Sequence, residues 1–527
     1  MFGKKKRLIQ KVEEAPLFHL DFKPEIPPLP EVEDKGAVNV RYPLIPPYAY
    51  AHIYWDINFK ELVYTVEEPE LNDYEKGVLV VLEEGIKELI NISFVSVQEG
   101  DTLIRYLEKN IRVLLDELRI KLSKYSYLKL MYYIYRDFVG LNEIEPFLND
   151  YFVEDIECNG VDYPIYIVHR KYRNLRTNIT FTDVKKLTSF VEKLAQKCGQ
   201  YVSYATPLLD GALPDGSRVN ATFTEEISTR GPTFTIRKFT KEPWTPIQLM
   251  KFGTVSPELL AYLWILIEHE LNIMIIGGTG SGKTTFLNAL TFFIPPQARI
   301  VSIEDTRELN LKHDNWLPSV ARAGVGLTNL VGQRYGEVSL FDLLRESFRQ
   351  RPDYVIVGEV RGKEAFVLFQ GMASGHPSFS TMHANSVDTM IKRLQTPPIN
   401  LSSSLVETLD VVCVMTQTKV KGKEVRRIRE INEVINVEEE KGAILNTPFM
   451  WDPKTDSFFF KTDSYIFKKI YTRQGISREV LEREFKLRTK LLVKLYQHKI
   501  FNFKEVQDII NEYYKSPEVV LRRFKVI

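Results

Sequence analysis

A glycine-rich stretch at residues 277–285 carries the clearest chemistry in this sequence. The apolar run IMII, residues 273–276, leads into GGTGSGKTT, and a helical pattern of apolar residues follows. Glycines let backbone N–H groups turn around phosphate oxygens, and the start of the following helix adds partial positive charge. The pattern GxxxxGK[ST], placed between a strand and a helix, therefore predicts a site for nucleotide phosphates. Its members are Gly277, Gly278, Thr279, Gly280, Ser281, Gly282, Lys283, Thr284 and Thr285.

Residue types in and beyond this loop predict ATP and Mg²⁺ as ligands. We expect Lys283 to reach the β- and γ-phosphates and Thr284 to give its hydroxyl to Mg²⁺. Glu304 and Glu359 each follow a short apolar run. A carboxylate at the end of a buried strand beside such a loop can hold the metal or orient the attacking water. We expect Glu359 to act as the base and Glu304 to support metal or water. The alternative for each is a capping or surface carboxylate.

Two histidines, His376 and His383, lie seven residues apart in GHPSFSTMHAN. A neutral or protonated imidazole can donate a hydrogen bond to a phosphate oxygen, and its charge changes near neutral pH. Both histidines are therefore candidates for sensing a bound nucleotide. The alternative is one histidine in the core and one on the surface.

The order of these motifs resembles that of a known family. The glycine-rich loop is followed by IEDTRE, VIVGEVRG and GHPSFSTMHAN. This series is similar to the Walker A, Asp box, Walker B and His box of the secretion ATPase superfamily. Its members include the hexameric motors of type II and type IV secretion, type IV pili and the archaellum. YPLIPPYAYAHIYWD and VRRIREINEV make the archaeal branch the most similar. The resemblance implies that His376 and His383 lie near the γ-phosphate.

The resemblance extends upstream to LPDGSRVNATF and GPTFTIRKF. It implies that Arg218, Arg230 and Arg237 close over the nucleotide, in several members across a subunit boundary. There they would stabilise the charge that grows on the phosphoryl oxygens. Each could instead be an ordinary arginine on a strand surface. The chain departs from many bacterial members in two ways: it lacks the four-cysteine zinc insertion, and Thr306 replaces a proline in the Asp box, which leaves the role of Glu308 open.

Composition limits the class of protein. The 527 residues are 44% hydrophobic and 26% charged, which is ordinary for a globular protein. The formal net charge of +1 gives no overall attraction to nucleic acid. The apolar run at residues 259–267 is short of the roughly 20 residues that cross a bilayer. Three widely spaced cysteines predict a reducing compartment without a disulfide framework.

The elements needed to position these residues predict an α/β fold. We expect a RecA-like P-loop ATPase domain with a parallel sheet, preceded by an α/β N-terminal domain and followed by a helical C-terminal extension. Ser477 and Asn502 are predicted helix caps. The predicted division is a flexible basic and proline-rich tail (1–40), an α/β and helical region (41–144), a small α/β domain with the arginines (145–240), a linker (241–250), the ATPase domain (251–440) and a C-terminal hairpin with helices (441–527).

The resemblance implies a Mg²⁺-dependent homohexameric ATPase that drives assembly of a type IV pilus-like or archaellum filament. It would act through a polytopic membrane platform protein and reach the filament subunits only indirectly. Motion of the N-terminal domain, hinged near residues 241–246, would transmit the work. We expect a cytoplasmic protein, held at the inner face of the membrane by its partner, without direct nucleic-acid binding. The alternatives are a DNA-transport or conjugation-type ATPase of the same superfamily, an ATP-dependent nucleic-acid-binding RecA-like protein, and a scaffold that binds ATP without turnover.

Overall fold

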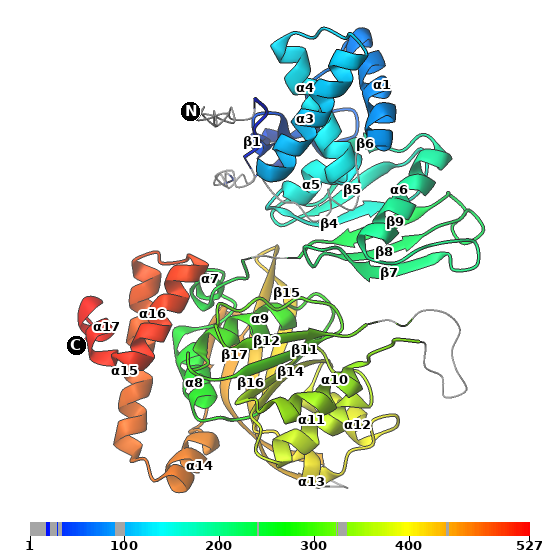
Figure 1. The fold of residues 1–527 in the computed structure, drawn as a ribbon. Helices are drawn as coiled ribbons and strands as arrows, with labels where there is room; N and C mark the ends of the chain where they lie inside the picture. The colour runs from blue at the N-terminus through cyan, green and yellow to red at the C-terminus, as the bar shows by residue number, and fades with distance from the viewer. Residues whose placement is uncertain are drawn as a thin grey trace, which may run out of the picture. The chain divides into compact units, whose positions relative to one another are not determined.

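The computed structural model divides the chain into two compact units, Met1–Phe239 (unit 1) and Thr240–Ile527 (unit 2). It describes residues 17–21, 29, 34–89, 101–239, 242–322, 324, 335–438 and 442–527. The basic head at residues 4–7, part of the predicted tail, lies outside the described residues. Figure 1 shows that each unit combines a sheet with packed helices, which confirms the predicted α/β class.

The described part of unit 1 is built on one sheet with the strand order β1-β2-β3-β6-β5-β4-β9-β8-β7. Neighbouring strands are antiparallel, except that β3 and β6 are parallel. The strands are β1 (Asn39–Ile45), β2 (Ala49–Asp56), β3 (Glu61–Glu67), β4 (Val153–Cys158), β5 (Pro164–His169), β6 (Arg173–Thr180), β7 (Leu208–Ala212), β8 (Arg218–Thr222) and β9 (Thr233–Arg237). Strands from both sides of the predicted boundary at residue 145 therefore share one sheet.

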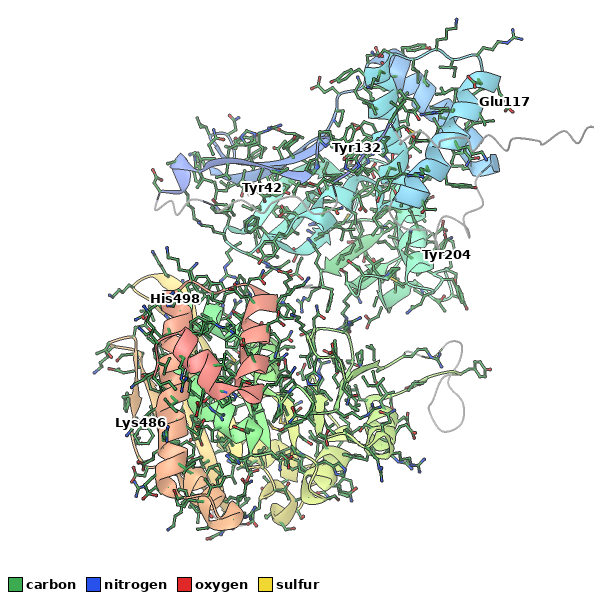
Figure 2. The ribbon with its side chains drawn as sticks, turned by 60° about the vertical axis from the view of Figure 1, so that its left-hand side comes forward. Tyr42, Glu117, Tyr132, Tyr204, Lys486 and His498 are labelled. Carbon is green, nitrogen blue, oxygen red and sulfur yellow. The ribbon has the colours of Figure 1, made fainter. Side chains whose placement is uncertain are left out.

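Amphipathic helices cover this sheet. They are α1 (Asp73–Leu89), α3 (Asp101–Glu117), α4 (Lys124–Ile134), the π-helical turn η2 (Tyr135–Val139), α5 (Glu145–Asn149) and α6 (Val184–Lys197), with 3₁₀ turns η1 (Lys35–Ala37) and η3 (Asn142–Ile144). Leucine and isoleucine at steps of three and four put one face of α3 into the core, where Leu103, Leu107 and Ile111 are buried. Figure 2 labels Tyr42 and Tyr132, which belong to the buried core.

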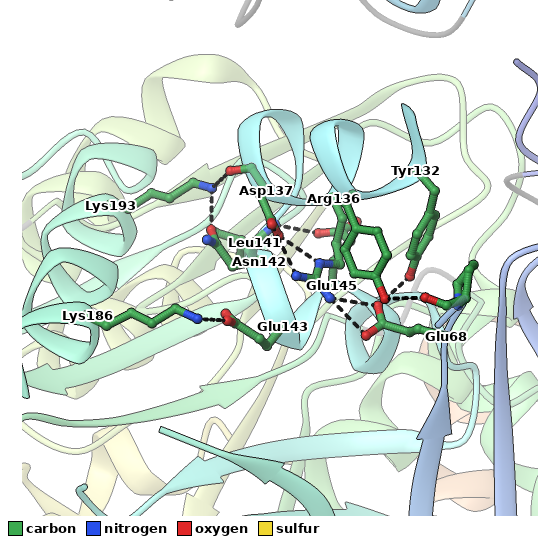
Figure 3. A network of polar contacts seen from close by, with 12 residues as sticks. Glu68, Tyr132, Arg136, Asp137, Leu141, Asn142, Glu143, Glu145, Lys186 and Lys193 are labelled. Carbon is green, nitrogen blue, oxygen red and sulfur yellow. Dashed lines mark hydrogen bonds and ion pairs between the residues drawn. The ribbon is translucent and has the colours of Figure 1, made fainter. Parts of the chain in front are cut away.

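A polar network links η2 to the end of β3 (Figure 3). Arg136 donates to Glu68 at 2.8 Å and to Asp137 at 2.7 Å, and the hydroxyl of Tyr132 donates to Glu68 at 2.6 Å. Lys193, on α6, donates to the carbonyl of Asp137 at 2.6 Å. These hydrogen bonds, most of them with a charged donor, connect α4, η2 and α6 and stabilise their arrangement.

The predicted flexible tail is wrong at its described positions. Phe18 and Leu20 are 0% and 2% exposed, and the Phe18 N–H donates to Glu108 at 3.0 Å. β1 also begins before the predicted end of the tail, at Asn39. Two apolar side chains that bury completely provide enough hydrophobic free energy to anchor a short segment, about 2 kcal/mol each.

Unit 2 also has one sheet in its described part, with the order β12-β11-β13-β14-β10-β15-β16-β17-β18. Strands from β12 to β15 are parallel, and those from β15 to β18 are antiparallel. The strands are β10 (Ile273–Gly277), β11 (Ile300–Glu304), β12 (Trp316–Val320), β13 (Tyr354–Val357), β14 (Ser378–His383), β15 (Val411–Val420), β16 (Lys423–Glu438), β17 (Gly442–Asp452) and β18 (Ser457–Phe460). β10, β11 and β13 are buried at every position, as expected for strands covered on both faces.

The helices of unit 2 alternate with the parallel strands and then form a C-terminal group. They are α7 (Pro246–Lys251), α8 (Pro257–Glu268), α9 (Lys283–Leu290), α10 (Leu340–Ser347), α11 (Glu364–Ala373), α12 (Val387–Gln395), α13 (Ser403–Val406), α14 (Tyr465–Gln474), α15 (Arg478–Gln497), α16 (Phe503–Lys515) and α17 (Pro517–Arg523), with 3₁₀ turns η4 (Thr291–Phe293) and η5 (Phe348–Gln350). Ser477 and Asn502 cap α15 and α16, as predicted. In the described part of the chain, every helix is too short or too polar to cross a membrane.

Two predicted boundaries do not match these elements. Residues 246–250 belong to α7 rather than to a linker, because Thr245 and Gln248 form a capping box and Pro246 occupies the first turn. β17 pairs with β16, so the strands on either side of residue 440 extend one sheet. The apolar run at residues 259–267 lies within α8 and is buried at every position, and Arg488 of α15 lies over the ring of Trp264 at 4.9 Å.

Candidate nucleotide site

The glycine-rich loop joins β10 to α9 in a shape that requires its glycines. Gly280 and Gly282 have φ of 72° and 92°, in the left-handed region where a Cβ is strained. A Cβ on Gly277 would lie 2.6 Å from Ser281 Oγ, which itself donates to the carbonyl of Gly278 at 2.8 Å. Lys283 is then the first residue of α9. The loop thus presents backbone groups at a helix N-terminus, the arrangement that suits phosphate.

Strand register brings the other motifs to the carboxyl ends of the parallel strands, where the glycine-rich loop also lies. Gly277, the last residue of β10, pairs with His383, the last residue of β14. Glu304 ends β11, and Glu359 lies two residues beyond the end of the neighbouring β13. Because all four strands are parallel, their carboxyl ends meet where ligands bind in open α/β sheets. Lys283, Glu304, Glu359 and His383 therefore gather from segments distant in sequence.

His383 connects Lys283 to Glu359. Lys283 Nζ donates to the carbonyl of Gly278 at 3.0 Å and lies 3.3 Å from His383 Nδ1. An ammonium has only donors, so Nδ1 accepts, and the neutral imidazole carries its proton on Nε2, 3.1 Å from Glu359 Oε1. Burial, helped by the charge of Lys283, lowers the pKa of His383 and so favours this neutral form. Burial also lowers the pKa of Lys283, against the attraction of Glu359.

Arg361 is a neighbour of Glu359 that the sequence reasoning missed. Its Nη2 donates to Glu359 Oε2 at 2.6 Å, and its Nη1 lies 3.7 Å from Asp305. Glu359 Oε1 is buried and makes no hydrogen bond with the described residues, although His383 Nε2 lies 3.1 Å away. The signal was present in the sequence, because Arg361 follows Glu359 by two residues in GEVRG. One carboxylate oxygen is therefore held while the other can accept a proton.

Glu304 is 1% exposed, and one of its two carboxylate oxygens makes hydrogen bonds with the described residues. Its Oε1 accepts from the backbone N–H groups of Glu308 and Leu309, both at 2.9 Å, while Oε2 has no partner among the described residues. Burial raises the pKa of Glu304 to about 7, against the effect of these two N–H donors. A cation placed beside the free oxygen would stabilise the ionised form of this buried carboxylate. The backbone contact also gives Glu308 a position in the site without involving its side chain.

The residues fit a bound Mg²⁺ only when phosphates share it. Among the described residues, no three His, Cys, Asp or Glu side chains are grouped to hold a metal ion by themselves. The hydroxyl of Thr284 and the free oxygen of Glu304 are hard oxygen donors, of the kind Mg²⁺ takes alongside substrate phosphates.

The prediction that His376 lies near the γ-phosphate is wrong. His376 precedes β14, whereas His383 ends it, and β14 runs parallel to β10 with Phe379 opposite Ile273 at the start of both strands. Seven residues of extended chain span about 23 Å, so the two histidines lie at opposite ends of β14. The ring of His376 packs against Phe348 at 4.9 Å. The seven-residue spacing places the two histidines at the two ends of one strand rather than in one site.

The three predicted arginines belong to unit 1, and the structure separates Arg230 from the other two. Arg218 and Arg237 are direct cross-strand partners on β8 and β9. Each also pairs with a carboxylate: Arg218 with Asp210 at 3.1 Å, and Arg237 with Asp155 at 2.9 Å. Arg230 lies in the connection at the other end of the hairpin, over the ring of Tyr163 at 4.3 Å. Their approach to a nucleotide stays a prediction.

Comparison with known proteins matches residues 139–445 to the family described as type II/IV secretion system protein, and residues 454–526 to the family described as PilB3-like, C-terminal. An uncharacterized protein of Methanocaldococcus jannaschii is 39% identical over 404 residues, which cover 76% of this chain and 72% of that protein. The type IV secretion system protein PtlH of Bordetella pertussis is 31% identical over 269 residues, covering 45% and 78%. The crystal structure of the VirB11 ATPase from the Brucella suis type IV secretion system is 24% identical, with a TM-score of 0.28 over 55% of this chain and 91% of that one.

Proposed function

We propose a specific task for this chain, which belongs to the type II/IV secretion system protein family of ATPases. It is a homohexameric motor that hydrolyses ATP with Mg²⁺ and drives assembly of a type IV pilus-like or archaellum filament. The observation that best supports turnover is Glu359 Oε1, which is buried, makes no hydrogen bond with the described residues and lies at the end of the parallel strands where Lys283 also lies. A protein that only binds ATP has no need of an acceptor placed there.

Each residue of the site has a part in this reaction. The loop N–H groups and Lys283 hold the phosphates, and Glu359 Oε1 takes a proton from the attacking water. Thr284 and Glu304 would hold Mg²⁺, and the ion would supply positive charge to the phosphate oxygens. Arg361 keeps the Glu359 carboxylate in one orientation.

His383 links phosphate occupancy to the base. When phosphate oxygens engage Lys283, the contact between Lys283 and His383 Nδ1 weakens, and the imidazole is free to turn toward the phosphate. Its movement changes the surroundings of Glu359 Oε1, 3.1 Å away. In this way, binding of the terminal phosphate changes the environment of the Glu359 carboxylate.

Work passes from the nucleotide to a membrane partner by relative movement of the two units. Arg218 and Arg237, side by side on one hairpin, would reach a phosphate together, in the same or a neighbouring subunit. Residues 242–244, which precede the capping residue Thr245, provide the hinge. The chain acts on the cytoplasmic side of the membrane, where it binds a polytopic platform protein and reaches the filament through it.

Two experiments test this proposal. Purified wild-type protein should hydrolyse ATP with a specific activity that rises with protein concentration, while Glu359→Gln should bind ATP and lose at least about a hundredfold in kcat. Glu346→Gln, which removes an exposed carboxylate of α10, is the matched control and should stay within twofold. Unchanged turnover in Glu359→Gln would support a scaffold instead.

The second experiment is electron microscopy of cells lacking the gene and of cells carrying Lys283→Ala. Loss of thin pili with archaella retained indicates a pilus motor, and loss of the archaellum alone indicates a rotary motor. If every filament survives, a DNA-transport ATPase becomes the better candidate, and DNA transfer between cells would then be measured. That second function is favoured by a relative from Mycobacterium tuberculosis that is described as a putative conjugal transfer protein and is 31% identical over 227 residues. Single-stranded DNA that stimulates hydrolysis in a salt-dependent way would indicate a nucleic-acid-binding ATPase.

A further inference from the structure

Two segments that are distant in the sheet supply the oxygen atoms proposed for Mg²⁺. Thr284 lies in the first turn of α9, directly after the glycine-rich loop, and Glu304 ends β11. β13 and β14 lie between β11 and β10, the strand that leads into the loop. The sheet alone therefore leaves the distance between Thr284 and Glu304 loosely determined, and a direct contact between α9 and the segment after β11 would fix it.

Asn288 makes such a contact. It lies four residues after Thr284, so the two side chains project from the same face of α9, one turn apart. Its Nδ2 donates to the carbonyl of Glu308 at 3.3 Å, and its Oδ1 accepts from the N–H of Asn310 at 3.4 Å. One carboxamide thus pairs with both an acceptor and a donor of a single short segment.

The segment that Asn288 contacts is also the one that orients Glu304. Glu304 Oε1 accepts from the N–H groups of Glu308 and Leu309, both at 2.9 Å, while Oε2 makes no hydrogen bond with the described residues. Asn288 bonds to the backbone on either side of Leu309. A shift of residues 308–310 would move both N–H donors and turn the free oxygen of Glu304 with them.

Burial distinguishes Asn288 from a second contact of the same segment. Asn288 is 4% exposed, so water does not compete for its carboxamide. Lys312 donates to Asp508 of α16 at 2.5 Å, but these side chains are 35% and 63% exposed. An exposed ion pair of this kind contributes little to the position of a segment. The buried contact through Asn288 is therefore the one expected to hold residues 308–310 in place.

We propose that Asn288 is a positioning residue that sets the distance between Thr284 and Glu304, and with it the affinity of the site for Mg²⁺. This inference rests on the proposed ATP site. Mg²⁺ takes nearly octahedral coordination with oxygen ligands at about 2.0–2.1 Å, so a small displacement of one ligand weakens its binding. Asn288 bonds to backbone groups of the protein and acts only through the residues that it holds.

The test separates the contribution of the metal from that of the phosphates. Calorimetric titration of the full chain with a non-hydrolysable ATP analogue, once with excess Mg²⁺ and once with EDTA, gives the factor by which Mg²⁺ tightens binding. For Asn288→Ala we expect this factor to fall about tenfold or more, the usual effect of removing a residue that orients a metal ligand. The affinity measured in EDTA should stay within twofold. Lys312→Ala, which removes only the exposed contact, should keep the wild-type factor.

Asn272 provides the matched control for lost stability. It is 8% exposed, its Nδ2 donates to the carbonyl of Thr408 at 2.8 Å, and its Oδ1 accepts from the N–H of Ser378 at 3.0 Å. It precedes β10 and so lies at the end of that strand away from the loop. Asn272→Ala should lower the unfolding temperature at least as much as Asn288→Ala and leave the Mg²⁺ factor unchanged. If Asn288→Ala does not fold, the milder Asn288→Ser should lower the factor instead.

Each other outcome overturns the inference. An unchanged Mg²⁺ factor in the Asn288 variants would show that Glu304 keeps its position without this contact. Equal weakening in Mg²⁺ and in EDTA would indicate general damage to the glycine-rich loop, and an equal fall in Asn272→Ala would indicate an effect of stability alone. A wild-type protein that binds the analogue equally with Mg²⁺ and EDTA, or not at all, would instead contradict the proposed site, and the role of Asn288 with it.

Discussion

His383 Nε2 lies 3.1 Å from Glu359 Oε1, while Nδ1 of the same ring lies 3.3 Å from Lys283 Nζ. The imidazole therefore stands between the residue expected to hold phosphate and the residue expected to act on water. His376 has no such position, because it lies at the other end of β14 against Phe348.

The two histidines consequently form a matched pair for mutation. We expect His383→Ala to lower kcat for ATP hydrolysis at least about tenfold, because it removes the link between Lys283 and the general base. His376→Ala should leave kcat within twofold. The measurement is steady-state phosphate release at saturating ATP. Equal losses in the two variants would show that the seven-residue spacing matters for a reason other than contact with the site.

Arg361 is expected to orient Glu359 without touching the nucleotide. Arg361→Ala frees Oε2 from its 2.6 Å hydrogen bond, so the carboxylate samples unproductive orientations. We expect kcat to fall about tenfold and the KM for ATP to change less than twofold. Arg361→Lys should restore part of the loss, because an ammonium can make one of the two contacts. A large rise in KM with kcat unchanged would show instead that Arg361 binds the nucleotide.

The sequence predicted the site at those points where one local segment carries both the residues and their geometry. The loop at residues 277–285 is such a case, since its glycines and its strand–helix context determine the turn. The positions of Glu304 and Glu359 also followed from counting to the end of an apolar strand. His376 was misplaced because a fixed spacing can indicate either one site or two ends of a strand.

Pairing between distant segments could not be read in the same way. Nothing local to Arg426 indicates that it meets the carbonyl of Gly280, 146 residues earlier in the chain. The same holds for the parallel pairing of β3 with β6. This pairing joins β1, β2 and β3 to the sheet that also contains the arginine-bearing strands β8 and β9. Such contacts depend on sheet order, which the hydrophobic pattern of a single strand does not determine.

Glu304 should make the stability of the protein depend on pH. Its folded pKa of about 7 lies above the ordinary value of 4.5, so between these values the folded state keeps a proton that the unfolded state releases. The free energy of unfolding should therefore decrease as pH rises through this window, by up to about 3 kcal/mol. Glu304→Gln should remove that decrease in urea unfolding without Mg²⁺ between pH 4.5 and 7.5.

Glu346→Gln is the matched control for this titration, because it removes an exposed carboxylate on α10 and leaves Glu304 and its two backbone N–H donors unchanged. It should keep the wild-type pH dependence. Addition of Mg²⁺ with a non-hydrolysable ATP analogue should flatten the wild-type profile, since a neighbouring cation favours the ionised carboxylate. A wild-type profile that is already flat without Mg²⁺ would mean that Glu304 is ionised throughout.

Arg218 and Arg237 should act as one unit. Because they are cross-strand partners, a single phosphate can meet both, and each alanine variant should lower kcat by about a hundredfold or more, with the double variant little worse than either. Arg230→Ala, at the far end of the hairpin, should stay within threefold. Additive losses at Arg218 and Arg237 would show that they act on separate targets.

Mixing two inactive variants tests whether that pair serves a neighbouring subunit. Arg218→Ala retains an intact loop and Glu359, whereas Glu359→Gln retains the arginine pair. If arginines cross a subunit boundary, a mixed assembly contains some sites with an intact Glu359 from one variant and an intact Arg218 from the other, and hydrolysis recovers on mixing. If the arginines serve their own subunit, every site in the mixture lacks one group, and activity stays at the level of the separate variants. Wild-type protein mixed with Glu359→Gln gives the reference for how freely subunits exchange.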